Sequence, residues 1–213
     1  MRIKNIIPVF LAMITLVSCI GVKADIVFNS DKSGTIALEY RMSGLLESLG
    51  KLDGNEAYPP VPVGKTDFER TIARLPGVKL VSWNSREDKN DKIIDVKLQF
   101  ANPGALAGFL DAGSGRAFYA EEGGTGKLTF ILSDGKLPRD PNFYDLFRRI
   151  SAGYNFSVSV SLPAEGKLSL TGNDGKAFTG AAEMVSGGRK PMFSMPLEMI
   201  LFAQDGLKAE FSW

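Results

Sequence analysis

The sequence predicts an α+β fold: a curved, mostly antiparallel sheet of about eight to ten strands with four or five short amphipathic helices. The first observation behind this prediction is strict alternation of apolar and polar side chains, clearest over residues 154–162. Such alternation is typical of a strand with one buried and one wet face, which favours antiparallel pairing. The second is a set of short segments with apolar residues at helical spacing, bounded by capping residues, glycine or proline.

A hairpin is predicted at the start of the folded region. Residues 25–30 and 35–42 have strand patterns, and Asp31-Lys-Ser-Gly34 separates them with turn-forming residues. Leu45, Leu46 and Leu49 then indicate a short helix that ends at Gly50. The proline-rich residues 51–65 are interpreted as a stiff surface connector.

A helix, a second hairpin and a second helix follow. Residues 66–75 begin with capping-box spacing and end before Pro76-Gly77. Residues 78–83 and 93–100 predict a hairpin around a charged turn from Arg86 to Lys92. Asn102-Pro103 then provides the cap and first-turn proline of the next helix.

The remaining elements are predicted by the same signals. They are a hairpin over 117–122 and 127–132, a helix over 140–153, strands over 154–162, 168–170, 182–185 and 207–213, and a short helix over 196–202.

Composition limits the classes of function. The chain has 213 residues, 25 Lys and Arg, and 24 Asp and Glu, a balance that argues against a nucleic-acid partner. It has no His, which removes the commonest general base and metal ligand, so we predict no metal site and no cofactor. Its single Cys cannot form an intrachain disulfide.

The N-terminus has the pattern of an export signal. Arg2 and Lys4 precede a run of 12 apolar and small residues, Ile6 to Val17. That run is shorter than the ~20 residues needed to span a membrane, and it fits a cleaved signal peptide. Removal of the leader takes away two positive charges, which leaves 23 Lys and Arg against 24 Asp and Glu.

The residues after the apolar run, Leu16, Val17, Ser18 and Cys19, resemble the lipobox of bacterial lipoproteins. The resemblance implies that the Cys19 thiol receives diacylglycerol, that the leader is cut before Cys19, and that the new amine is acylated. The expected division is then a signal peptide over 1–18, a lipidated tether over 19–24 and a single α+β ectodomain over 25–213. The alternative is cleavage after Ala24, which would give a freely secreted domain.

A second resemblance covers most of the mature chain. A strand after Cys19, the turn Asp31-Lys-Ser-Gly34 leading into Thr-Ile-Ala-Leu-Glu-Tyr40, the strand Ile-Asp-Val-Lys-Leu-Gln-Phe100 and the ending Ser-Leu-Pro163 are similar in order to LppM-type lipoproteins of bacterial envelopes. This resemblance implies an exported, membrane-associated domain. It supplies no catalytic residue.

Motifs that could carry catalysis have simpler interpretations. Ser48-x-x-Lys51 and Ser133-x-x-Lys136 match the core of penicillin-recognising enzymes, but Ser-Asp-Asn and Lys-Thr-Gly are absent from the sequence. Gly64-Lys65-Thr66 lacks the earlier glycine of a phosphate-binding loop. The acids between Arg86 and Asp91 are interpreted as solvated turn charges. The sequence therefore predicts a protein that is not an enzyme.

One apolar segment is a candidate surface for an apolar ligand or a protein partner, because methionine-rich surfaces adapt to varied partners. Its residues are Met192, Met195, Met199, Ile200 and Phe202. Burial in the core is the competing interpretation. Three functions follow: an envelope scaffold or interaction module at a membrane, a carrier of an apolar ligand such as lipid, and an enzyme, the least supported. The expected location is the cell envelope, on the inner or outer membrane, with the membrane contacted through the N-terminal lipid.

Overall fold

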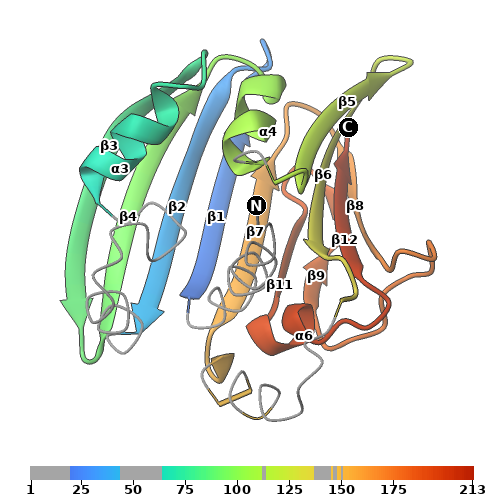
Figure 1. The fold of residues 1–213 in the computed structure, drawn as a ribbon. Helices are drawn as coiled ribbons and strands as arrows, with labels where there is room; N and C mark the ends of the chain where they lie inside the picture. The colour runs from blue at the N-terminus through green and yellow to red at the C-terminus, as the bar shows by residue number, and fades with distance from the viewer. Residues whose placement is uncertain (1–19, 44–63, 112–113, 137–144, 146–147, 150) are drawn as a thin grey trace, which may run out of the picture.

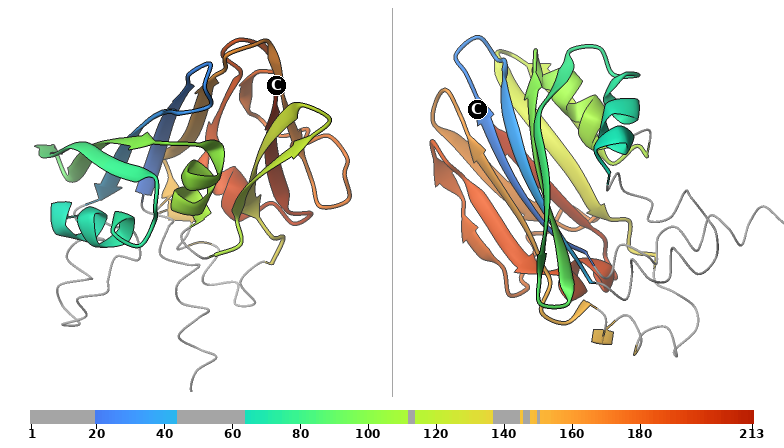
Figure 2. Two further views of the ribbon diagram at one scale, coloured as in Figure 1. Left: turned by 90° about the horizontal axis from the view of Figure 1, so that it is seen from above. Right: turned by 90° about the vertical axis from the view of Figure 1, so that its left-hand side faces the viewer.

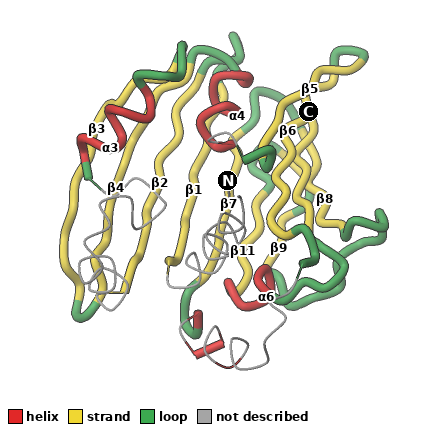
Figure 3. The backbone as a smooth tube through the Cα atoms, in the orientation of Figure 1, coloured by secondary structure: helices red, strands yellow, loops and turns green. Residues whose placement is uncertain are grey.

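The computed structural model describes residues 20–43, 64–111, 114–136, 145, 148–149 and 151–213. In these residues, twelve strands form two sheets and three helices lie beside them (Figure 1). Strands account for 52% of the structure and helices for 16%. The chain is thus mostly β in the part that the structure describes (Figure 3).

The larger sheet has seven strands, and β1 lies at its centre. Every neighbouring pair is antiparallel except β1 and β7, which are parallel. The strands, in spatial order, are β3 (Val78–Asp88), β4 (Asp91–Phe100), β2 (Gly34–Ser43), β1 (Ile20–Phe28), β7 (Asn155–Ser161), β11 (Met192–Pro196) and β9 (Glu183–Val185).

The smaller sheet has five strands, and all of its pairings are antiparallel. In spatial order they are β10 (Gly187–Gly188), β8 (Gly166–Thr171), β12 (Leu207–Ser212), β6 (Thr125–Ser133) and β5 (Ala117–Glu122). The helices are α3 (Lys65–Ile72), α4 (Pro103–Asp111) and α6 (Leu197–Leu201).

The core lies between the inner faces of the two sheets. Every second residue of β1 from Ala24 to Phe28 is buried there, as the two-residue period of a strand requires. Phe193 of β11 and Phe211 of β12 meet across the interface, with ring centroids 6.3 Å apart. Helix α4 contacts β5 of one sheet and β3 and β4 of the other, so it closes one side of the core (Figures 1 and 2).

The predicted α+β class with a single curved sheet is therefore wrong. The structure has two sheets, more strands than predicted and, among the described residues, three helices rather than four or five. Two strand segments lacked a clear alternating pattern: residues 20–24 and 192–196 were assigned to a tether and to an apolar segment. The helices predicted over 45–50 and over most of 140–153 lie outside the described residues.

Several predicted elements are confirmed, with changes at their ends. The β5–β6 hairpin, α3, α4, β7 and β12 occupy the predicted regions. The turn between β3 and β4 is only Lys89 and Asn90, because Glu87 pairs across the strands with Lys92 and the charged residues thus belong to the ladder. The short helix predicted over 196–202 is α6, which directly follows β11.

Candidate functional site

The first described residue after Cys19 already belongs to the sheet. β1 begins at Ile20, which stands opposite Met42 of β2, and Val22 stands beside Phe156 of β7. The tether predicted over residues 20–24 is therefore the first half of a central strand. Its backbone pairs on both sides, and Ala24 lies in the core. That burial is the physical reason for the correction.

Gly21 lies close under two neighbouring side chains. A Cβ atom built at Gly21 would lie 3.3 Å from Cδ1 of Tyr154 and 3.6 Å from Cβ of Arg41. The first of these approaches is tighter than most Cβ contacts, so the absence of a side chain at Gly21 allows Tyr154 to approach β1 closely. The start of β1 is thus held between a residue of β2 and a residue that precedes β7.

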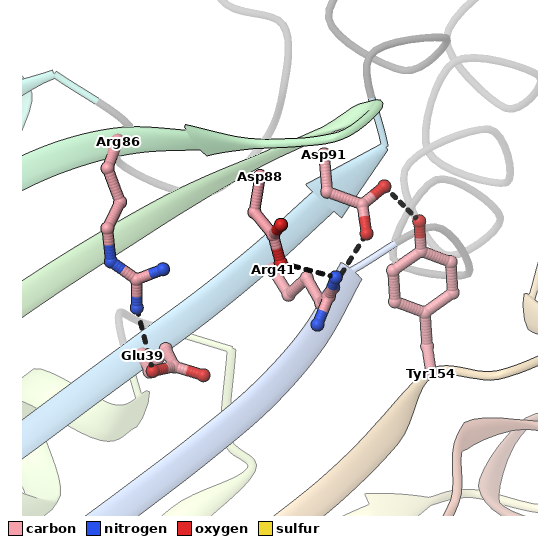
Figure 4. A network of polar contacts seen from close by, with 6 residues as sticks. All are labelled: Glu39, Arg41, Arg86, Asp88, Asp91 and Tyr154. Atoms are coloured by element: carbon pink, nitrogen blue, oxygen red, sulfur yellow. Dashed lines mark hydrogen bonds and ion pairs between the residues drawn. The ribbon is translucent and has the colours of Figure 1, made fainter.

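A polar network joins these two neighbours (Figure 4). The Arg41 guanidinium donates through Nε to Asp91 Oδ2 at 2.6 Å and through Nη2 to Asp88 Oδ2 at 3.0 Å. The Tyr154 hydroxyl donates to the other oxygen of Asp91, Oδ1, at 3.0 Å. Asp91 therefore links a β2 residue to the segment before β7, and we name Arg41, Asp88, Asp91 and Tyr154 the anchor-end network.

Two carboxylates of this network share one cation. The hydrogen bond to Asp91 is the largest cause that raises the pKa of Arg41 above its ordinary value. The side chain of Asp91 is 18% exposed, whereas those of Arg41 and Asp88 are near half exposed. Charge-assisted hydrogen bonds to a half-buried carboxylate fix geometry more strongly than exposed ion pairs do. The arrangement is suited to positioning the strand.

The rest of the outer face of the seven-stranded sheet is also polar. Arg86 lies 3.4 Å from Glu39 and 3.3 Å from Asp95. Two open hollows, with volumes of about 240 and 220 Å³, lie on this face beside β1 and β2. Neither hollow is lined by the 192–202 segment.

The described side chains offer little for catalysis. The Ser159 hydroxyl donates to Asp25 Oδ1 at 2.5 Å, but no histidine exists in the chain to serve as a general base beside it. In the described ranges, no three acidic or cysteine side chains are grouped so that they could hold a metal ion. No helix in the same ranges is long and apolar enough to cross a membrane.

The structure disperses the predicted apolar surface over two elements. Met195 and Ile200 are buried in the core, from β11 and α6 respectively. Met192, Met199 and Phe202 are half-buried. Binding of an apolar ligand or partner by these residues stays a prediction. The predicted lipidation residue Cys19 and the lipobox residues 16–18 lie outside the described residues.

Sequence reasoning missed the anchor-end network. Arg41 lay within the strand predicted over 35–42 and was given no role, and Asp88 and Asp91 were interpreted as solvated turn charges. Tyr154 was predicted as the first residue of the strand over 154–162, but it precedes β7 and its hydroxyl donates to Asp91. No short motif contains these residues, because they are brought together by the register of five strands, from β3 to β7 across the sheet.

No protein-family model matches the chain, and no curated protein matches it. The features that bear on function are therefore the position of β1 and the side chains around its first paired residues.

Proposed function

We propose that this chain is an exported lipoprotein, held at a membrane of the cell envelope by lipid on Cys19, and that its domain acts as a non-enzymatic scaffold or interaction module. The observation that carries the proposal is the start of β1 at Ile20, one residue after the lipobox cysteine. A leader cut before Cys19 leaves the whole strand in the mature protein.

The alternative cut after Ala24 would damage the sheet. It would remove five of the nine residues of β1, including the buried Ala24 and the closely packed Gly21. The backbone partners of those residues on β2 and β7 would lose their hydrogen bonds in the centre of a sheet, where unpaired polar groups are costly. The requirements of the fold thus favour the lipobox over the simple secretory site.

The second support is the chemistry of the lipobox product. A single acyl chain binds a membrane only weakly, whereas two or more chains give stable anchoring. A diacylglyceryl group on Cys19 would meet that requirement. The outer face of the seven-stranded sheet, with its paired charges and open hollows, supports contact with a polar partner better than an enclosed reaction.

The test is the chemical state of residue 19 in protein made by export-competent bacterial cells. We expect a palmitate analogue to label the wild-type chain, and the N-terminal peptide to begin at a modified Cys19. Cys19→Ala should abolish the label and leave the leader attached. Ser30→Ala, in an exposed turn far from the lipobox, should behave as wild type. A mature chain that begins at Asp25, or that carries an unmodified Cys19, would contradict the proposal.

A further inference from the structure

We infer that one end of the seven-stranded sheet rests against the bilayer surface, with the strands standing upright on it. This end, which we name the anchor rim, consists of the β3–β4 turn at Lys89 and Asn90, the start of β1, and residues 151–154 before β7. The inference rests on the proposed lipidation of Cys19, and its partner is a lipid surface rather than a protein.

The register defines the rim. Ile20 stands opposite Met42, Met42 opposite Lys92, and the parallel pairing places Tyr154 two residues before the partner of Val22. Asn90 and Ala152 each lie two residues beyond this level, on opposite sides of β1. At about 3.3 Å per strand residue, both turns reach roughly 7 Å past the start of β1. Figure 1 shows both turns at the same end of the sheet.

The short connection restricts how far the domain can move from the lipid. Only the backbone of Cys19 separates the acyl-bearing sulfur from Ile20, and a residue spans at most about 3.6 Å. β1 cannot swing out as a tether, because it is paired with β2 from Ile20 and with β7 from Val22, and Gly21 is packed under Tyr154. The acyl chains therefore hold this end of the sheet at headgroup level.

The charges of the rim are compatible with a headgroup layer. Arg41 pairs with both Asp88 and Asp91, which leaves one negative charge in excess in this group, and Arg148 Nε lies 2.9 Å from Glu198 Oε1. Glu87 stands opposite Lys92 in the strand ladder. Lys89 is exposed at the tip of the β3–β4 turn. Anionic headgroups would thus meet carboxylates that already have cationic neighbours, together with a lysine at the leading edge.

The opposite end of the sheet should be far from the membrane. The nine residues of β1 span about 30 Å at 3.3 Å per residue, so the turn at Ser30 should lie well beyond the headgroups. Ala164, which follows β7, lies at this far end as well, whereas Ala152 precedes the same strand. Ala152 and Ala164 therefore form a matched pair: the same residue type, exposed, in turns at the two ends of one strand.

The sequence makes a labelling test clean, because Cys19 is the only cysteine and would be acylated. Ala152→Cys, Ala164→Cys, Asn90→Cys and Ser30→Cys would each introduce the single free thiol for a fluorophore. Each acylated full-length product would be reconstituted in phosphatidylethanolamine and phosphatidylglycerol vesicles that contain a headgroup spin-labelled phosphatidylcholine. We expect several-fold stronger quenching at residues 152 and 90 than at residues 164 and 30.

Two results separate the inference from the proposed function. Intact mass of the same samples reports acylation at Cys19, so a missing lipid overturns both the proposed function and the orientation. Equal quenching at all four positions, or stronger quenching at residues 164 and 30, on acylated protein overturns the orientation alone. Because two independent positions represent each end, a single variant that fails to fold does not remove the comparison.

Discussion

The two ends of the seven-stranded sheet are held by different chemistry. At the anchor rim, Arg41, Asp91 and Tyr154 join β2, β4 and the segment before β7 through charge-assisted hydrogen bonds. At the far end, Phe28 packs against Phe100 at 5.2 Å and against Trp213 at 4.9 Å between ring centroids. The first end is polar and partly wet, and the second is aromatic and buried.

This difference indicates different roles for the two ends. Burial of aromatic side chains is a large and cooperative contribution to the free energy of unfolding. Partly exposed ion pairs contribute little to it, but they restrict local geometry. We therefore expect the far end to determine global stability. The anchor rim should determine only how firmly the start of β1, and with it the proposed lipid attachment point, is held.

Gly34→Ala should give the largest effect, at the far end. A Cβ at Gly34 would lie 2.0 Å from the carbonyl oxygen of Val27 and 2.5 Å from the ring of Phe100. Because one obstacle is backbone, the β1–β2 pair itself would have to shift, and we expect a loss of about 1–3 kcal/mol in the free energy of unfolding. Urea denaturation of the purified protein measures it.

Gly187→Ala is the matched control for this substitution. It is also a strand glycine, but the nearest atom to a Cβ there is 4.0 Å away. We expect almost no change in the urea midpoint. Equal losses for the two variants would mean that the far end is not more tightly packed than an edge strand, and the comparison would fail.

Arg41→Ala should give a smaller and more local effect, at the anchor rim. It removes the partner of Asp88 and Asp91. Asp91, the acceptor of the Tyr154 hydroxyl, should then hold Tyr154 less firmly over Gly21. For a partly exposed network we expect about 1 kcal/mol or less in global unfolding. The amides of residues 21–24 should exchange with deuterium several-fold faster, because local opening of the strand end becomes easier.

Arg86→Ala separates this positioning effect from a general loss of surface charge. Arg86 pairs with Glu39 and Asp95 on the same face of the sheet, whereas the side chains packed over Gly21 are those of Arg41 and Tyr154. The Arg86→Ala substitution should leave deuterium exchange at the amides of residues 21–24 unchanged. If the two arginine variants raised that exchange equally, the anchor-end network would have no special role in holding β1.

Sequence patterns identified the far end better than the rim. Phe100 lies in a strand whose alternation is plain in the sequence, Phe28 lies in a segment that was predicted as a strand, and both are buried. Residues 20–24 lacked such a pattern, since Gly21 and Ala24 are small and Lys23 is charged. Their strand conformation depends on Tyr154 and on parallel pairing with β7, which are contacts between segments about 130 residues apart in the chain.

The separation into two sheets also could not be predicted from local sequence patterns. Alternating apolar and polar residues indicate that one face of a strand is buried, but they do not indicate which other strand covers that face. Phe193 and Phe211 are both inward-facing, yet only the tertiary structure places them on opposite sheets. The prediction of one curved sheet failed for this reason, although most of its strands were located correctly.

The smallest expected effect concerns an ion pair that joins the two sheets at the far end. Lys32, in the β1–β2 turn, lies with its Nζ 2.7 Å from Oε2 of Glu121 on β5. This hydrogen bond, followed by one from Tyr119, holds the pKa of Glu121 below its ordinary value of 4.5. A lowered pKa in the folded state stabilises the fold above the unfolded-state pKa, and this contribution is lost as the pH falls through the folded-state pKa.

Lys32→Met should therefore move the pKa of Glu121 back up toward 4.5 and reduce the acid dependence of stability that this residue causes. Both side chains of the pair are exposed, so the change in stability at neutral pH should be close to the limit of detection. NMR titration of the Glu121 carboxyl group measures the shift directly. Lys127→Met, which removes a 3.7 Å contact with Glu210 in the same sheet, should leave the Glu121 titration unchanged. A Glu121 pKa unaffected by Lys32→Met would show that this contact does not form in solution. The far end would then be held by its aromatic packing alone, and the contrast with the anchor rim would become sharper.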